Sequence, residues 1–399
     1  MNKYLISDDW DFSVEHELKE KVTLPHDAML VSGRDCEAAS GQGGGYFLGG
    51  KYIYRKKFMP EPSWKEKDIF IEFEGVYPNA RVFLNGKEMG GCCYGYNQFR
   101  VKLEGINYEM ENQLFVEVDN TKLPNSRWYS GAGIYRPAWL IEASKKRIAL
   151  DGIRVETLSI HPAKIKVTIA LEGVEENSAI QVKVDIFYQD KLVFKSEGKE
   201  AEIEIRNAAL WSEESPDLYK ASVTLIEDGK EIDNQQISFG IRTITWNNGG
   251  LFINGKETKL KGGCIHHDNG ILGAMEFKEA EYRKIKRLKE FGFNAIRSAH
   301  NPASRELLEV CDELGMYVMD ETWDMWDKHK NEFDYAADFK DHFKEDIRAI
   351  VNKDFNHPSV IMYSIGNEVT EPAKEEGVKL ASEIVSGLKE LDNTRPVTC

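Results

Sequence analysis

The chain has 399 residues, with 52 lysines and arginines against 67 aspartates and glutamates, so its formal net charge is −15. Hydrophobic residues make up 41% and charged residues 30%, which is the balance of a soluble globular protein with roughly two to four domains. An acidic surface disfavours nucleic acid and anionic membranes as partners. No apolar run of about 18 residues occurs, so no transmembrane helix is predicted.

The first residues and the cysteines indicate the compartment. Residues 1–12 lack an apolar segment followed by a small-residue cleavage site, so no signal peptide is predicted. Cys92 and Cys93 are adjacent and the other four cysteines are scattered, which fits neither a disulfide framework nor a zinc site. We therefore expect a cytoplasmic protein with reduced thiols and no cofactor.

Residues 1–145 are predicted to form an all-β domain. Several short runs alternate apolar with polar residues, and turn residues separate them. Asn85-Gly86 favours a hairpin because both residues tolerate positive φ. A β-sandwich is the natural architecture. The expected strands cover residues 69–76, 80–87, 99–105, 113–120 and 138–144.

Residues 146–243 repeat this pattern with a different set of strands. About a hundred residues of closely spaced strands are typical of a small immunoglobulin-like sandwich. The expected strands cover residues 153–160, 164–173, 179–189, 201–207 and 218–229.

From residue 244 to residue 399, short apolar strands alternate with helices. This alternation favours a parallel sheet, and specifically a (β/α)₈ barrel. Only half of such a barrel is accounted for, so the chain is expected to stop in mid-barrel, and the open sheet edges would favour homo-oligomers. The expected strands are 259–267, 294–300, 316–321 and 361–368, with a fifth beginning at 396; the expected helices are 277–291, 303–314, 336–353 and 373–390.

Polar residues follow each expected barrel strand. Catalytic groups of such barrels sit at the carboxyl ends of the strands, so these residues predict a site on one rim. Glu368, after an apolar strand, is the best candidate for a general acid, because desolvation there would raise its pKa. The residues at the four strand ends are His266-His267-Asp268, Arg297 to Pro302, Asp320-Glu321 and Asn367-Glu368.

Several of these residues also have a structural interpretation. Glu321 either contacts substrate or accepts hydrogen bonds from Arg297 as a structural group. His300 is either a sugar contact or a buried, hydrogen-bonded histidine. Trp323, with Trp326, either stacks on a sugar or packs in the core.

The residues His266-His267-Asp268 form a second open question. They could touch substrate hydroxyls, or they could belong to a metal cluster. No fourth ligand stands at a suitable spacing, so the substrate role is preferred.

Longer motifs carry a resemblance to glycoside hydrolase family 2, the family of β-galactosidases, β-glucuronidases and β-mannosidases. The resemblance implies a jelly-roll-like sugar-binding β-sandwich at 1–145, an immunoglobulin-like β-sandwich at 146–243, and the N-terminal half of a TIM (β/α)₈ barrel at 244–399. The motifs are 43–58, 73–90, RWYSGAGIYRPAWL (127–140), FGIRT (239–243), LKGGCIHHDNGILG (260–273), NAIRSAHNPAS (294–304), MDETWDMW (319–326) and NHPSVIMYSIGNE (356–368).

The resemblance also implies a retaining mechanism, with two carboxylates about 5 Å apart flanking the glycosidic oxygen. Glu368 matches the acid/base and Asn367 the residue that hydrogen-bonds the sugar 2-hydroxyl. His266, Asp268 and His300 are expected to contact substrate, and Arg297 to support the site. Arg127 and Trp128 lie in a sandwich loop that we expect to reach the barrel mouth.

The chain departs from the family pattern in two respects. The family's nucleophile is a second glutamate beyond position 399, and no residue here matches it. The stretch TWDMWDKH (322–329) does not reproduce the magnesium ligands of some β-galactosidases, so no metal is expected.

Three functions remain open. A β-galactosidase acting on terminal β-galactosides is preferred, because residues 265–274 and 320–326 are closer to that branch. A β-glucuronidase or another exo-β-glycosidase of the family is the alternative. An inactive carbohydrate-binding remnant is the alternative of a different class.

Overall fold

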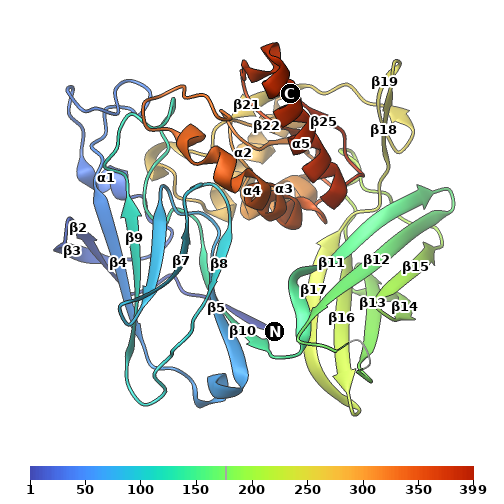
Figure 1. Ribbon diagram of the computed structural model, residues 1–399. Helices are drawn as coiled ribbons and strands as arrows, with labels where there is room; N and C mark the ends of the chain where they lie inside the picture. Colours follow the sequence, from blue (N-terminus) through green and yellow to red (C-terminus); the bar gives the residue numbers. More distant parts are fainter. Residues whose placement is uncertain (176–177) are drawn as a thin grey trace.

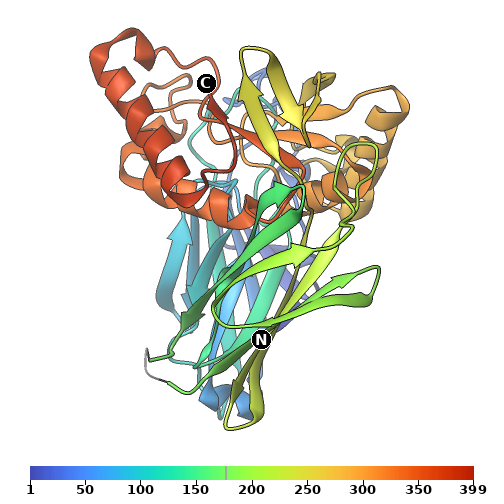
Figure 2. The same ribbon diagram turned by 90° about the vertical axis from the view of Figure 1, so that its right-hand side faces the viewer.

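The computed structural model describes residues 1–175 and 178–399. Two β-sandwiches stand next to each other, and a parallel sheet with its helices lies across their upper ends (Figure 1). A view turned by a quarter rotation shows the same helical layer above both sandwiches (Figure 2). None of the helices in the described residues is both long and apolar enough to cross a membrane.

The first sandwich packs a six-stranded sheet, in the order β3-β2-β4-β9-β6-β7, on a four-stranded sheet, β1-β10-β5-β8. Every second residue of β9 is buried, and the predicted hairpin at Asn85-Gly86 joins β6 to β7 with positive φ at both residues. The elements are β1 (Asn2–Leu5), β2 (Trp10–Val14), β3 (Glu17–Val22), α1 (Ala28–Ser32), β4 (Lys51–Phe58), β5 (Lys67–Phe73), β6 (Ala80–Leu84), β7 (Lys87–Cys92), β8 (Phe99–Lys102), β9 (Asn112–Asp119) and β10 (Ala138–Ser144).

The second sandwich faces the sheet β11-β12-β15 with the sheet β14-β13-β16-β17. Its core is built from alternating aliphatic residues of the inner faces, such as Ile165, Val167, Val184 and Val223. The strands are β11 (Arg147–Ile160), β12 (Ala163–Glu172), β13 (Gln181–Tyr188), β14 (Lys191–Glu197), β15 (Glu200–Ile205), β16 (Tyr219–Glu227) and β17 (Lys230–Phe239).

The third part contains the predicted half barrel, preceded by a small antiparallel sheet of β18, β19 and β20. Five parallel strands, β21 to β25, pair in chain order, and α2 to α5 connect them. The four predicted helices are confirmed within about three residues at each end, the usual uncertainty of helix boundaries. The bounds are β18 (Ile244–Asn247), β19 (Gly250–Ile253), β20 (Lys256–Glu257), β21 (Gly262–Ile265), α2 (Lys278–Glu290), β22 (Ala295–Ser298), α3 (Arg305–Leu314), β23 (Tyr317–Glu321), α4 (Phe339–Asp354), β24 (Val360–Ser364), α5 (Glu375–Leu391) and β25 (Val397–Thr398).

The two sandwiches contact opposite ends of the barrel strands. The first meets the carboxyl ends, where the Tyr94 hydroxyl donates to the carbonyl oxygen of Thr322 at 2.6 Å. The second meets the amino ends, where the Arg242 guanidinium donates to the carbonyl oxygens of Pro358 and Val360. The first sandwich is therefore the one placed to add residues to the predicted site.

Candidate active site

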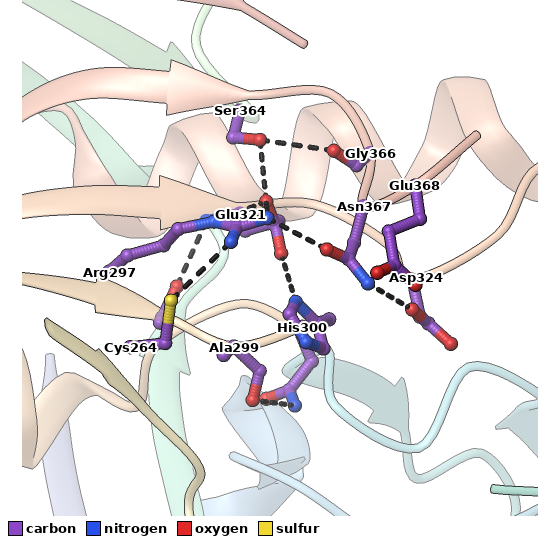
Figure 3. A network of polar contacts seen from close by, with 12 residues as sticks. Cys264, Arg297, Ala299, His300, Glu321, Asp324, Ser364, Gly366, Asn367 and Glu368 are labelled. Atoms are coloured by element: carbon purple, nitrogen blue, oxygen red, sulfur yellow. Dashed lines mark hydrogen bonds and ion pairs between the residues drawn. The ribbon is translucent and has the colours of Figure 1, made fainter. Parts of the chain in front are cut away.

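The carboxyl ends of β22, β23 and β24 bring their polar residues together (Figure 3). At the centre lies Glu321, the last residue of β23, whose side chain is fully buried. Its Oε2 accepts hydrogen bonds from Arg297 at 2.6 and 2.9 Å and from the Ser364 hydroxyl at 2.6 Å. Its Oε1 lies 2.7 Å from Nδ1 of His300.

These contacts correct the expectation that Glu321 touches substrate. With both carboxylate oxygens occupied and no exposed surface, Glu321 cannot face a ligand. The alternative interpretation holds: it is the structural group that fixes Arg297 and His300.

Asn367 is joined to the network around Glu321 through Arg297. Nη2 of Arg297 donates to Oδ1 of Asn367 at 3.1 Å, and Nδ2 of Asn367 donates to Asp324 at 2.8 Å. Asn367 is buried, so these two partners determine which way its amide points. Arg297 thus joins the buried Glu321 to Asn367, and its predicted supporting role stays a prediction.

Glu368 follows Asn367 on the rim, beside Asp324 (Figure 3). Its backbone φ is +47°, in the left-handed region that non-glycine residues seldom adopt and that is enriched at functional sites. Its side chain is 69% exposed, and its Oε2 lies 3.0 Å from Nη1 of Arg127.

The predicted pKa of Glu368 was wrong in direction. We expected desolvation to raise it, but the carboxylate is exposed rather than buried. The hydrogen bond and charge of Arg127, with the charge of Lys330, hold the pKa of Glu368 below its usual value.

Asp324 and Lys330 belong to the site although the sequence did not indicate them. Asp324 is buried and binds Arg127 through two contacts, Oδ2 to Nε at 2.9 Å and Oδ1 to Nη2 at 2.5 Å. Nζ of Lys330 lies 3.1 Å from Asp324 Oδ1 and donates to the Asn367 carbonyl oxygen. Burial favours the neutral acid, but the hydrogen bonds from Arg127 and Asn367 and the charge of Lys330 outweigh it and lower the pKa of Asp324.

Two histidines and a tryptophan line the other side of the rim. The His266 ring stacks on Trp128 at 5.1 Å and 22°, and His300 meets Trp128 edge-on at 5.5 Å. Nδ1 of His266 lies 2.7 Å from the Ala299 carbonyl oxygen, and burial lowers the pKa of His266. Both histidines keep some exposed surface, so each remains a candidate sugar contact.

The sandwich loop from Asn120 to Pro137 does reach the barrel mouth, because Arg127 and Trp128 both contact barrel residues. A cavity of about 60 Å³ between the first sandwich and the barrel is lined in part by Trp128 and His300. Its sandwich wall includes Tyr77, Asn79 and Asn125.

The two remaining members of the histidine motif do not join His266. His267 is buried against Tyr96 and Tyr135, and its Nε2 contacts the Ser130 carbonyl oxygen at 2.9 Å. Asp268 is exposed. The metal-cluster alternative is therefore not supported by the geometry, and no group of three histidine, cysteine or acidic side chains within residues 1–175 and 178–399 is placed to hold a metal ion.

The predicted sugar-stacking role of Trp323 was also wrong. Trp323 has no exposed surface and packs edge-on against Phe339 of α4, while its Nε1 donates to Asp346. Trp326 is equally buried, so both indoles are core residues beneath the rim.

Acid should destabilise the fold through His267. Burial lowers the pKa of His267 from 6.5 to about 3, so between these values the unfolded chain binds a proton that the folded chain excludes. The free energy of unfolding should fall by up to about 1.4 kcal/mol for each pH unit of acidification in that window. Urea unfolding should show that the free energy of unfolding depends less steeply on pH in His267→Gln than in the control His161→Gln, which changes an exposed histidine. Equal slopes in the two variants would refute the role of His267 in acid sensitivity.

Comparisons with known proteins show the family to which the chain belongs. Residues 142–242 match the family model described as "Glycosyl hydrolases family 2", and residues 244–399 match "Glycosyl hydrolases family 2, TIM barrel domain". The chain is 36% identical to "Beta-galactosidase BoGH2A" of Bacteroides ovatus over 428 residues, covering 94% of this chain and 50% of the relative. It is 35% identical to a "Putative beta-glucuronidase" of Formosa agariphila over 409 residues, covering 99% and 39%.

A solved structure has the same fold. The crystal structure of a glycosyl hydrolase family 2 member from Bacteroides cellulosilyticus superposes with a TM-score of 0.93 at 35% identity, covering all of this chain and 56% of that one. This chain spans about half the length of the curated relatives it matches.

Proposed function

Because this chain belongs to glycosyl hydrolase family 2, we propose that the protein containing it is a retaining exo-β-glycosidase with Glu368 as its acid/base. The observation that carries the proposal is the position of Glu368. Its carboxylate is exposed on the rim, next to the buried Asn367, at the carboxyl end of the fourth barrel strand.

In a retaining mechanism, one carboxyl protonates the glycosidic oxygen while a second carboxylate attacks the anomeric carbon. The first group then takes a proton from water as water displaces the second. Glu368 fits the first role. The neighbouring carboxylates, Glu321 and Asp324, are buried and tied to cations, so neither fits the second. We infer that the nucleophile lies outside residues 1–399.

The other rim residues have roles that follow from their orientation. The Asn367 amide, held by Arg297 and Asp324, is placed to hydrogen-bond a sugar hydroxyl. His266 and His300, backed by Trp128, offer ring nitrogens to further hydroxyls beside an aromatic surface.

A neutral galactoside is the substrate we favour. The charges at the rim pair with one another: Arg297 with Glu321, and Arg127 and Lys330 with Asp324 and Glu368. Three cations thus offset three carboxylates, which leaves this part of the rim close to neutral. The likeness to the Bacteroides ovatus β-galactosidase supports the same choice. The second candidate is a β-glucuronide, favoured by the likeness to the Formosa agariphila relative.

A panel of 4-nitrophenyl β-glycosides, tested on the full-length protein, distinguishes the candidates. We expect the highest kcat/KM on the β-galactoside. A higher kcat/KM on the β-glucuronide would replace galactoside by glucuronide as the substrate. Sugar binding without hydrolysis of any glycoside would overturn the enzymatic function altogether.

A further inference from the structure

The Glu368 carboxylate is contacted by a residue from a different domain. Arg127 lies between β9 and β10 of the first sandwich, whereas Glu368 follows β24 of the barrel. Nη1 of Arg127 reaches Oε2 of Glu368 at 3.0 Å across 241 positions of sequence. A cation in this position acts on whichever charge state the carboxyl adopts.

Arg127 is held in place on its other edge. Its Nε and Nη2 bind the two oxygens of Asp324, a bidentate geometry that fixes the plane of the guanidinium. Only the Nη1 edge is then left to point outward, toward Glu368. Asp324 is itself anchored by Asn367 and Lys330.

The backbone of Arg127 is also constrained. A Cβ atom at Gly43 would lie 3.2 Å from the Arg127 carbonyl carbon, so the glycine-rich loop of the first sandwich packs directly on this residue. A third of the Arg127 side chain is exposed, which is less than expected for an arginine extended freely into solvent. The contact with Glu368 is thus made by an arginine fixed at both its backbone and its head group.

We propose that Arg127 is a positioning residue which the first sandwich contributes to the barrel's acid/base, orienting the Glu368 carboxylate and stabilising its ionised form while Asp324 holds the guanidinium. This inference rests on the proposed function, since it assigns Arg127 a part in the same two-step reaction.

The two steps respond to Arg127 in opposite ways. In the first, a proton passes from Glu368 to the glycosidic oxygen as the anomeric C–O bond breaks and the bond to the nucleophile forms. In the second, water loses its proton to ionised Glu368 and attacks the anomeric carbon, while the bond between that carbon and the nucleophile breaks. Arg127 therefore favours the second step and opposes the first. Two other groups face the carboxylate: Lys330 acts with Arg127, and Asp324 acts against it.

The first experiment follows the Glu368 carboxyl directly, without requiring activity. The protein, labelled with ¹³C at glutamate carboxyls, is titrated by NMR, with the Glu368→Gln spectrum assigning the resonance. We expect Arg127→Gln to move the titration midpoint of Glu368 upward by about one pH unit, the low end of what one neighbouring charge causes. In Arg127→Lys, which keeps the charge, the titration midpoint of Glu368 should lie close to its wild-type value.

The matched control is Arg81→Gln, which removes an exposed arginine of the same sandwich that pairs with Glu88. It should leave the Glu368 midpoint unchanged. An unmoved midpoint in Arg127→Gln, in a variant with the wild-type melting temperature, would overturn the proposal.

The second experiment measures the pH profile of hydrolysis by the full-length protein. The alkaline limb of kcat/KM, which reports the protonated acid, should move to higher pH in Arg127→Gln by the same amount as the NMR midpoint. A shifted NMR midpoint with an unshifted alkaline limb would show that Glu368 is not the catalytic acid, so the proposed function would fail while the contact with Arg127 stands. If neither the NMR midpoint nor the alkaline limb moved, the role of Arg127 would be overturned and the proposed function would stand.

Discussion

Replacing Glu368 by glutamine in the full-length protein is expected to lower kcat/KM for a β-glycoside with a poor leaving group by about 10²- to 10⁴-fold, the range that general acid–base catalysis contributes. Glutamine keeps the shape of the side chain and can still accept the hydrogen bond from Arg127. Its amide has no proton acidic enough to be transferred to the leaving oxygen. Steady-state kinetics on an alkyl or phenyl glycoside would measure the loss.

Two features of the Glu368→Gln result separate catalysis from binding. A competitive sugar inhibitor should bind the variant about as well as it binds the wild type, because the binding groups are untouched. The matched control, Glu376→Gln on the exposed surface of α5, should retain full activity. Turnover by Glu368→Gln equal to that of the control would remove Glu368 from its role.

The largest effect on stability is expected from Glu321→Ala. This change leaves Arg297 without its carboxylate partner and removes the shorter of the two hydrogen bonds of the buried Ser364 hydroxyl. Breaking a buried ion pair from one side costs about 3–5 kcal/mol. We expect the low end of that range here, because the Arg297 side chain is 27% exposed and still donates to Asn367. Urea denaturation should show this loss as a lower midpoint for the unfolding of the barrel segment.

A control on the neighbouring helix α3 defines the scale for that loss. Glu309 pairs with Lys278 at 3.0 Å, and both side chains are more than 40% exposed. Glu309→Ala should change the free energy of unfolding by less than about 1 kcal/mol, as exposed ion pairs do. Equal unfolding midpoints for Glu321→Ala and Glu309→Ala would contradict the structural role of Glu321.

The barrel segment could be predicted well from sequence because its signals are local. Four apolar strands alternate with helices whose apolar residues recur at helical spacing, and both patterns were confirmed. The parallel order of the strands then placed Arg297, Asn367 and Glu368 on one rim without any knowledge of the contacts.

Five strands of the first sandwich were not predicted: β1, β2, β3, β4 and β7. For two of them, β1 and β3, the reason is their position at a sheet edge. All four residues of β1 are exposed, and β3 is a charged edge strand with five exposed residues of six. Neither alternates apolar with polar residues, so periodicity cannot identify it. Their pairing partners, not their own sequences, make them strands.

The site residues that were missed or misjudged depend on long-range contacts. Asp324 gains its role from Arg127, 197 positions away, and nothing in the local stretch distinguishes it from Asp327. Trp323 lies next to the rim in sequence but points into the core beneath it. The exposure of Glu368, and therefore its lowered pKa, depends on how the first sandwich and the barrel meet.

The most direct test of the central claim is the product that Glu368→Gln forms in the presence of azide. Azide needs no base, so it can attack the covalent glycosyl-enzyme that the variant hydrolyses slowly, on the face that the leaving group vacated. We expect an activated aryl β-glycoside to give the β-glycosyl azide, identified by the anomeric proton in the NMR spectrum. Formation of the α-glycosyl azide, or no azide product together with undiminished hydrolysis, would contradict this expectation.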